Sequence, residues 1–389
     1  MNASRWAVYT LLAAVVFCAA GCGDLPGPLV LAARQSGALC AMAARVYPSR
    51  TPVGGVRVRG LYLTGWTVGG RDRLRHYIEL AKTTEINAYA IDVKDSDGYV
   101  GYASDVPTVR EAGAWLRKYN PDKVIPVLHA NGIRAIGRVV CFKDPVLSSK
   151  RPEWAILDIK GKLWKDRDHK TWLNPHTRDS WKYLMAVTRE AVAKGFDEIQ
   201  FDYVRFPSDG PKKAMQFGDT RGHTKYDLVR EFLAYARCEL PGVVLSADVF
   251  GIICESREDT EDIGQYLERI GGDMDYLSPM VYPSHYALGQ VINGARYAAP
   301  DLEPYKVVYN SLVKAKRRIA ATPEFHANVR PYLQDFTASW LGKGRYRAYD
   351  ADEVRQQIKA VYDAGYDRWL LWSARNQYSE AALEHKTTP

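Results

Sequence analysis

Carboxylate side chains interrupt several short apolar segments of this sequence, and they are the residues best suited to chemistry. The clearest case is the segment Phe196–Pro207, which reads FDEIQFDYVRFP. If this segment is a β-strand, alternation places Ile199 and Phe201 on one face and Asp202 on the other. A buried ionised aspartate is costly unless it is paired or functional, and Arg205 is near enough in sequence to be its partner. We therefore expect Asp202 at the centre of an active site, with a purely structural Asp202–Arg205 pair as the alternative.

Polar and aromatic residues also occur at or near the ends of the other apolar segments. Glycoside hydrolysis needs two carboxyl groups, one protonated to supply a proton to the leaving oxygen and one ionised to act as nucleophile or base. Tyrosine and tryptophan rings offer flat apolar faces on which sugars can stack. The pattern therefore indicates a site for a carbohydrate. The candidates besides Asp202 and Arg205 are Asp92, Lys94, Asp95, Arg138, Asp248, Tyr282, His285, Tyr286, Asp335 and Trp372.

Other hydrolytic chemistries have weaker support in the sequence. The eight histidines are scattered and form no HxH or HExxH pattern, which argues against a metal-dependent hydrolase, and we expect no metal or other cofactor. No GxSxG motif is present, and no histidine stands at an indicative place for Cys141 as a nucleophile. A non-catalytic carbohydrate-binding barrel is the main alternative, because it would keep the aromatic rings and use the same acids as hydrogen-bond acceptors.

The elements that must position these residues are eight short apolar segments, most of them separated by stretches of helical periodicity. Two of these stretches end at Gly195 and Gly365, just before the next apolar segment, as expected where a helix returns to a strand. The pattern predicts an α/β fold, a (β/α)8 TIM barrel, with catalytic groups at the carboxyl ends of the strands. An open doubly wound sheet is the alternative, although no GxGxxG follows the first strand. The predicted strands are 56–63, 88–93, 134–140, 198–203, 243–249, 276–282, 329–336 and 368–372, and examples of the predicted helices are 71–82, 180–194, 225–239 and 352–364.

Composition narrows the class of protein only slightly. The 389 residues are 47% hydrophobic and 25% charged, which is ordinary for a globular protein and long enough for one large barrel or two domains. The net charge is +8, but basic and acidic residues are interspersed, so we do not expect nucleic-acid binding. The sequence does not indicate an oligomeric state. Beyond the first 22 residues, the cysteines that allow three full disulfide pairings, or remain free thiols, are Cys40, Cys141, Cys238 and Cys254.

The N-terminus has the pattern of an export signal. The apolar run 11–20 follows one basic residue, Arg5, and is too short to span a bilayer. The residues Ala19–Cys22 resemble a bacterial lipobox, which implies lipid attachment at Cys22 and a membrane-anchored, extracytoplasmic location. Secretion without a lipid and a retained anchor are the alternatives. The predicted organisation is a signal peptide (1–21), a lipid-anchored tether (22–55), the barrel (56–380) and a C-terminal tail (381–389).

Several motifs occur together along most of the chain: VRGLYLTGW (58–66), AIDVKDSDG (90–98), GFDEIQFDYVRFPSDG (195–210), SADVFG (246–251), DYLSPMVYPSHY (275–286) and RPYLQDF (330–336). In these motifs the sequence resembles a family of glycoside-hydrolase-like domains of unknown specificity, distantly similar to the alpha-amylase superfamily. The resemblance implies hydrolysis of a poly- or oligosaccharide, with Asp202 as the nucleophile. It further implies Asp248, where amylase-like enzymes have glutamate, as the general acid. Asp335 would stabilise the transition state.

Overall fold

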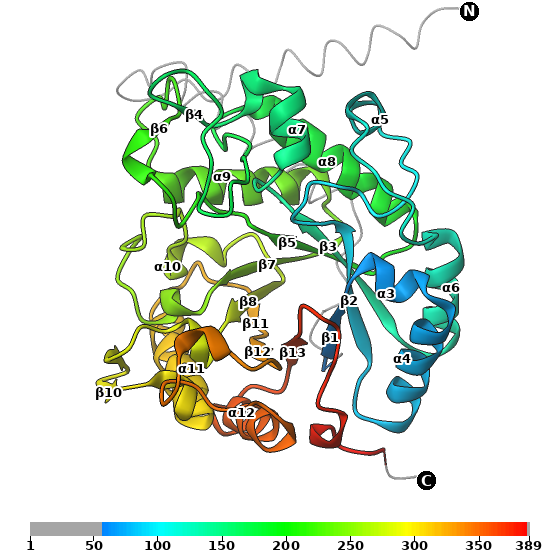
Figure 1. The fold of residues 1–389 in the computed structure, drawn as a ribbon, viewed down its shortest axis with the longest axis vertical. Coiled ribbons are helices and arrows are strands. Elements are labelled where there is room, and N and C mark those ends of the chain that lie inside the picture. Colours follow the sequence, from blue (N-terminus) through cyan, green and yellow to red (C-terminus); the bar gives the residue numbers. More distant parts are fainter. Residues whose placement is uncertain (1–56, 387–389) are drawn as a thin grey trace, which may run out of the picture. The chain divides into compact units, whose positions relative to one another are not determined.

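Short apolar segments form one closed parallel barrel in residues 57–386, the part of the chain that the computed structural model describes (Figure 1). The barrel strands are β1 (Arg59–Leu63), β2 (Ala88–Lys94), β3 (Arg134–Val140), β5 (Glu198–Asp202), β7 (Val244–Phe250), β8 (Tyr276–Met280), β11 (Asn328–Val329), β12 (Tyr332–Gln334) and β13 (Trp369–Trp372). Their order is β11-β8-β12-β13-β1-β2-β3-β5-β7, and the pairing of β7 with β8 closes the barrel. The seventh strand position is divided into β11 and β12, because Pro331 lies between them and has no N–H to donate to the ladder.

Helices connect most of the strands and cover the outside of the barrel (Figure 1). Their ends carry the expected signals: Thr224 caps α9, and Asp350 and Glu353 form a capping box at α12. Smaller strand pairs decorate the loops. The helices are α3 (Gly65–Gly69), α4 (Arg71–Thr83), α5 (Pro107–Ala112), α6 (Pro121–Ala130), α7 (Pro145–Lys150), α8 (Arg178–Ala193), α9 (Lys225–Glu239), α10 (Leu267–Ile270), α11 (Pro304–Ala320) and α12 (Ala351–Asp363), and the small strands are β4 (Leu157–Asp158), β6 (Met215–Gln216), β9 (Gln290–Ile292) and β10 (Ala295–Tyr297).

The closed barrel confirms the predicted (β/α)8 architecture and excludes the open doubly wound sheet. The predicted helix 225–239 coincides with α9, whereas the predicted continuous strand 329–336 is wrong, because Pro331 splits it. The predicted signal peptide, the tether and Cys22 lie outside the described residues. No helix of residues 57–386 is long and apolar enough to cross a membrane.

The two faces of the barrel strands are chemically different. On the outer face, Phe201 of β5 packs against Phe232 of α9, with ring centroids 5.7 Å apart. On the inner face, Glu198 accepts hydrogen bonds from Arg330 at 3.0 and 2.5 Å, and Gln200 accepts one from the Tyr332 hydroxyl at 2.8 Å. Because inward residues on a strand recur every second position, Asp202 lies in the next layer above Gln200, toward the carboxyl ends of the strands. A hydrogen-bonded polar layer therefore forms the floor beneath Asp202.

Candidate active site

Arg138 of β3 bridges two aspartates from the neighbouring strands. Its Nε and Nη2 atoms lie 2.9 and 2.5 Å from Oδ2 of Asp202, and its Nη1 lies 2.6 Å from Oδ1 of Asp92. Asp92, Arg138 and Asp202 are 4%, 3% and 5% exposed, so these are buried ion pairs. Such pairs persist only where the remaining hydrogen-bonding capacity is also satisfied. Here the Tyr203 N–H donates to Oδ1 of Asp202 at 2.6 Å and the Tyr62 hydroxyl donates to Oδ2 of Asp92 at 2.7 Å.

The charges of this cluster reinforce one another. Although burial lowers the pKa of Arg138, the carboxylates of Asp202 and Asp92 raise it well above its usual range. Burial raises the pKa of Asp92, although Arg138 and the hydrogen bond from Tyr62 act in the opposite direction. The permanently charged guanidinium of Arg138 therefore forms ion pairs with two buried acids, and it holds Asp202 in a fixed orientation.

Asp248 of β7 has an environment opposite to that of Asp202. It is 1% exposed, and its Oδ1 atom has no hydrogen-bond partner among the described residues. Burial raises the pKa of Asp248 well above its usual range, and the negative charge of Asp202 raises it further. Burial therefore favours the protonated form of Asp248, whereas Asp202 is held in an ion pair. Two carboxyl groups in contrasting environments are the arrangement by which acid and base roles are separated.

The Tyr282 hydroxyl is a second buried polar group without a hydrogen-bond partner in residues 57–386. Burial raises the pKa of Tyr282, and the charges of Asp248 and Asp202 raise it further, which places this hydroxyl near both acids. Buried polar groups in native proteins are normally hydrogen-bonded. An unsatisfied hydroxyl and an unsatisfied carboxyl oxygen in one cluster therefore indicate groups that are available to a ligand.

Aromatic rings enclose the cluster on one side. Trp372 of β13 stacks on Tyr62 with ring centroids 3.9 Å apart and an interplanar angle of 17°. The Arg138 guanidinium carbon lies 5.1 Å from the Trp372 centroid and 5.2 Å from the Tyr62 centroid, within the range of cation–π attraction. Trp372 is only partly buried, and the exposed His285 ring lies 5.2 Å from Tyr282. The predicted residues Trp372, Tyr282 and His285 thus lie along an aromatic border of the cluster.

Arg205 does not pair with Asp202, so the predicted Asp202–Arg205 pair is wrong. The chain turns directly after β5, where Tyr203 has a φ of +49°. Arg205 donates instead to the Phe206 carbonyl oxygen at 2.9 Å, and its guanidinium carbon lies 4.5 Å from the centroid of the Phe250 ring. The prediction relied on closeness in sequence, whereas the partner that the barrel supplies comes from the adjacent strand.

Lys94 and Asp95 belong to the structure around the site and not to the cluster. The pairing of β2 with β3 shifts register between Asp92 and Lys94, which changes the direction of the following side chain. Lys94 is fully buried and forms an ion pair with Asp144 at 3.0 Å. Asp95 accepts the Tyr99 N–H at 3.1 Å and forms an ion pair with Lys118. Substrate binding by Lys94 and Asp95 stays a prediction, and the contacts seen here give both residues a structural role.

Tyr286 and Asp335 are also held by other parts of the fold. The Tyr286 hydroxyl shares a hydrogen bond of 2.8 Å with Ser311 of α11, in a separate apolar cluster. Asp335 accepts hydrogen bonds at 2.8 Å from both the N–H and the hydroxyl of Ser379, and burial raises the pKa of Asp335 to about 6. Neither residue has a contact with Asp202 or Asp248 among the described residues. The roles of Tyr286 as a substrate contact and of Asp335 as a catalytic group therefore stay predictions, and the structure places both residues outside the Arg138 cluster.

Tyr62 is a site residue that the sequence reasoning missed. It lies in the motif VRGLYLTGW, whose strand was predicted without an assignment of its faces. In β1, alternation sets Leu61 and Leu63 in the core cluster under the helices and Tyr62 among the inward residues. A polar ring between two leucines of a strand was the signal that could have identified it.

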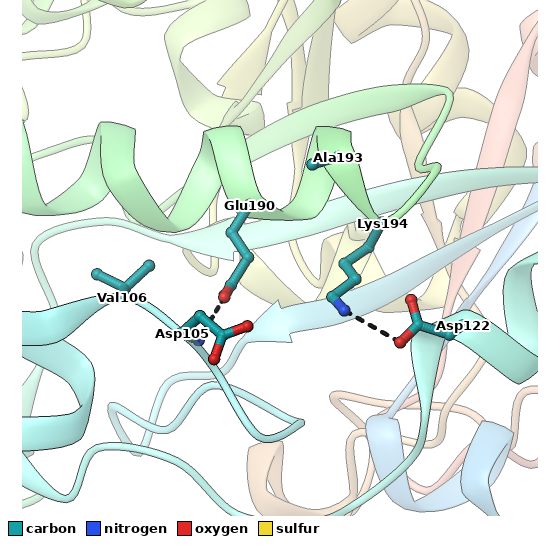
Figure 2. A pocket seen from close by; sticks show the side chains of 6 residues that line it. All are labelled: Asp105, Val106, Asp122, Glu190, Ala193 and Lys194. Carbon is teal, nitrogen blue, oxygen red and sulfur yellow. Dashed lines mark hydrogen bonds and ion pairs between the residues drawn. The ribbon is translucent and has the colours of Figure 1, made fainter.

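The hollow shown in Figure 2 is not part of the cluster. Glu190 of α8 accepts the Asp105 N–H at 2.6 Å, and Lys194 forms an ion pair with Asp122 at 3.0 Å. The polar groups of this hollow therefore largely satisfy one another.

In residues 57–386, no group of three histidine, cysteine or acidic side chains has the arrangement of a metal site. Cys141 and Cys254 are buried free thiols, and burial raises the pKa of Cys141 well above its usual range.

Comparison with known families gives one extended match. A family described as "Putative glycosyl hydrolase domain" matches residues 60–378, which confirms the resemblance that the sequence motifs indicated. No curated protein sequence matches the chain.

Solved structures provide further likenesses. A hypothetical protein from Ruminiclostridium thermocellum ATCC 27405 is 61% identical over 49% of this chain and 97% of its own, with a TM-score of 0.47. The PgaB (BpsB) glycoside hydrolase domain from Bordetella bronchiseptica is 13% identical over 85% of this chain and 100% of its own, with a TM-score of 0.60. Alpha-L-fucosidase isoenzyme 2 from Paenibacillus thiaminolyticus is 12% identical over 84% of this chain and 48% of its own, with a TM-score of 0.52. The last two likenesses, at such low identity, concern the fold alone.

Proposed function

Because the chain belongs to the family of putative glycosyl hydrolase domains, we propose that it is an extracytoplasmic glycoside hydrolase that cleaves a poly- or oligosaccharide with two carboxyl groups. The observation that carries this proposal is the contrast between Asp202, which is ion-paired with Arg138, and Asp248, whose pKa burial raises. Such a contrast supplies an ionised group and a proton donor at the same pH.

In the proposed reaction, Asp248 gives its proton to the glycosidic oxygen while Asp202 attacks the anomeric carbon. The bond from the anomeric carbon to the leaving oxygen breaks, and a glycosyl–Asp202 ester forms. Asp248, now ionised, then takes a proton from a water molecule, which hydrolyses the ester and restores both acids. Arg138 keeps the attacking carboxylate oriented and stabilises its charge when it is released.

The remaining side chains of the cluster bind the sugar in this proposal. The unpartnered Tyr282 hydroxyl is available for a hydrogen bond to substrate. The partly buried Trp372 ring offers a stacking face beside Arg138. Asp92 acts through Arg138 and Tyr62 and is therefore a positioning residue.

A variant series tests the proposal. The purified wild-type protein is screened against a panel of polysaccharides for newly formed reducing ends, with Asp202→Asn, Asp248→Asn and Asp335→Asn alongside. We expect the first two variants to lose turnover and to keep substrate binding. Asp335→Asn is the matched control, since it removes a buried carboxyl outside the cluster. Binding without turnover in the wild type would instead identify a non-catalytic carbohydrate-binding barrel.

We also propose the location outside the cytoplasm, attached to the membrane by a lipid on Cys22. The proposal rests on the apolar run 11–20 and the lipobox-like residues Ala19–Cys22. Metabolic labelling with a radioactive fatty acid tests it: the wild type should carry label and Cys22→Ser should not. Equal labelling of both proteins would refute the lipid anchor and leave the hydrolase proposal unaffected.

A further inference from the structure

An open hollow of about 630 Å³ lies among the segments that follow β1, β2 and β3. It is separate from the hollow of Figure 2, and its walls combine an aromatic ring with several charged groups. The side chains that matter for its chemistry are Trp66, Asp97, Tyr99, Lys118, Lys150 and Lys170.

The walls of this hollow come from the same strands that carry the Arg138 cluster. Trp66 follows Tyr62 of β1 by four residues, and Asp97 follows Asp92 of β2 by five. Helix α7, which begins at Pro145 and ends at the lining residue Lys150, comes directly after β3. The carboxyl ends of parallel barrel strands share one rim. The hollow and the Arg138 cluster therefore lie at the same end of the barrel.

Trp66 gives the hollow a stacking surface. Its side chain is 58% exposed, although it stands on the short helix α3, whose neighbouring residues are buried. Lys118 lies 5.8 Å from its ring centroid and supports the ring from one side. A large ring that a rigid element presents to solvent, beside polar side chains, is typical of a binding surface.

The charges that a ligand can reach are mainly positive. Lys118 forms an ion pair with Asp95 and is only 8% exposed, so it is already engaged. Lys170 forms an ion pair with Asp97 at 2.9 Å, but both side chains are well exposed, so this pair is weak and Lys170 can also contact a ligand. Lys150 is exposed and has no ion pair within residues 57–386. The hollow thus has two accessible ammonium groups, on Lys150 and Lys170, and one accessible carboxylate, on Asp97.

We propose that this hollow is a subsite for an acidic sugar unit of a glycan chain, with the sugar ring on Trp66 and its anionic group near Lys150 and Lys170. The proposal rests on the proposed hydrolase function and specifies its substrate class: a polymer whose units carry carboxylate or sulfate groups. In this proposal the glycan chain runs along the barrel rim, from the cleaved bond at Asp202 and Asp248 to the acidic unit in this hollow.

Binding to the full-length Asp202→Asn protein tests the subsite without turnover. The probes are dextran, dextran sulfate and polygalacturonate, measured by titration calorimetry at two salt concentrations. Dextran and dextran sulfate share a backbone, so their difference isolates the charge, and polygalacturonate distinguishes a carboxylate from a sulfate. We expect at least one anionic polymer to bind more tightly than dextran, and more weakly at the higher salt concentration.

Variants then assign the binding to the hollow. In the Asp202→Asn background, Trp66→Ala and Lys150→Glu should each weaken the binding of the anionic polymer by roughly tenfold or more, because each removes a stacking face or a charge-assisted contact. Trp66→Phe keeps a ring and should restore most of the affinity. Lys82→Glu is the matched control: it makes the same charge change in α4, where Lys82 forms only an exposed pair with Glu79.

The outcomes separate the two proposals. Equal binding of dextran and its sulfate, no binding of either polyanion, or equal effects of Lys150→Glu and Lys82→Glu would overturn the acidic subsite. If the wild type cleaves a neutral glycan and Trp66→Ala does not change polymer binding, the hydrolase proposal is supported and the subsite proposal is refuted. Binding that depends on Trp66 and Lys150, without turnover of any glycan by the wild type, would keep the subsite and refute the hydrolase.

Discussion

Replacing Arg138 with methionine tests the central electrostatic argument directly. The guanidinium makes two contacts with Asp202 and one with Asp92, and all three side chains are buried. Arg138→Met keeps an unbranched apolar stem and leaves two buried carboxyl groups without their cation. Removal of one partner from a buried ion pair costs about 3–5 kcal/mol of unfolding free energy. Against a total of about 5–15 kcal/mol for a typical domain, the loss is large.

The loss should depend on pH. Without Arg138, the guanidinium no longer opposes the effect of burial on Asp92, so the pKa of Asp92 rises further above its value in the unfolded chain. The folded variant then binds more protons than the unfolded chain, and its stability falls as the pH rises above about 4, the unfolded value for aspartate. Urea unfolding at pH 5 and pH 8, followed by tryptophan fluorescence, measures this dependence. The destabilisation relative to wild type should be larger at pH 8.

Arg205→Met is the matched control for this experiment. Arg205 is equally buried, but its guanidinium contacts a backbone carbonyl and aromatic rings and has no carboxylate partner in the described part of the chain. Burial lowers the pKa of Arg205, so its removal should cost less and should produce no comparable pH dependence. Equal losses for the two variants, or a loss below about 1 kcal/mol for Arg138→Met, would refute the assignment of Arg138 as the partner of both acids.

Three further predictions concern single residues. Asp248→Asn should slow hydrolysis of natural glycosides by about 10²-fold or more, because it removes the proton donor. An aryl glycoside with an acidic phenol as leaving group needs no protonation, so it should form the glycosyl–enzyme at nearly the wild-type rate. Equal losses on both substrates would contradict the role of Asp248 as general acid. Burial raises the pKa of Asp335 to about 6, so the unfolding free energy of the wild type should fall as the pH rises from about 4 to about 6, because Asp335 ionises first in the unfolded chain. In Asp335→Asn, urea unfolding should show a flatter pH dependence over this range. An unchanged dependence would show that Asp335 does not titrate there. Trp372→Ala should raise KM more than it lowers kcat, because the ring binds sugar and takes no part in the chemical step. Steady-state kinetics on one substrate measure both constants, and a loss mainly in kcat would contradict this role.

The sequence alone determined the barrel and the place of Asp202 in it. Alternation of apolar and polar residues is a local property with a period of two, so it fixes which side chains of a strand share a face. It set Gln200 and Asp202 opposite Phe201, and the structure has Gln200 hydrogen-bonded within the barrel and Phe201 packed on α9. The repeated order of strand and helix then predicted a parallel sheet, since parallel strands need helical crossovers, and the eight strand segments favoured a closed barrel over an open sheet.

Only the tertiary structure decided the partners of each side chain. Arg138 meets Asp92 and Asp202 because the register of β2, β3 and β5 places three separate strands side by side. The turn at Tyr203 directs Arg205 away from the acid three positions before it, and the register shift in β2 buries Lys94 against Asp144. Cross-strand register and barrel closure are non-local, so no spacing within one segment encodes them. The sequence thus determined which residues face inward, and the packing of the strands decided which of them form a site.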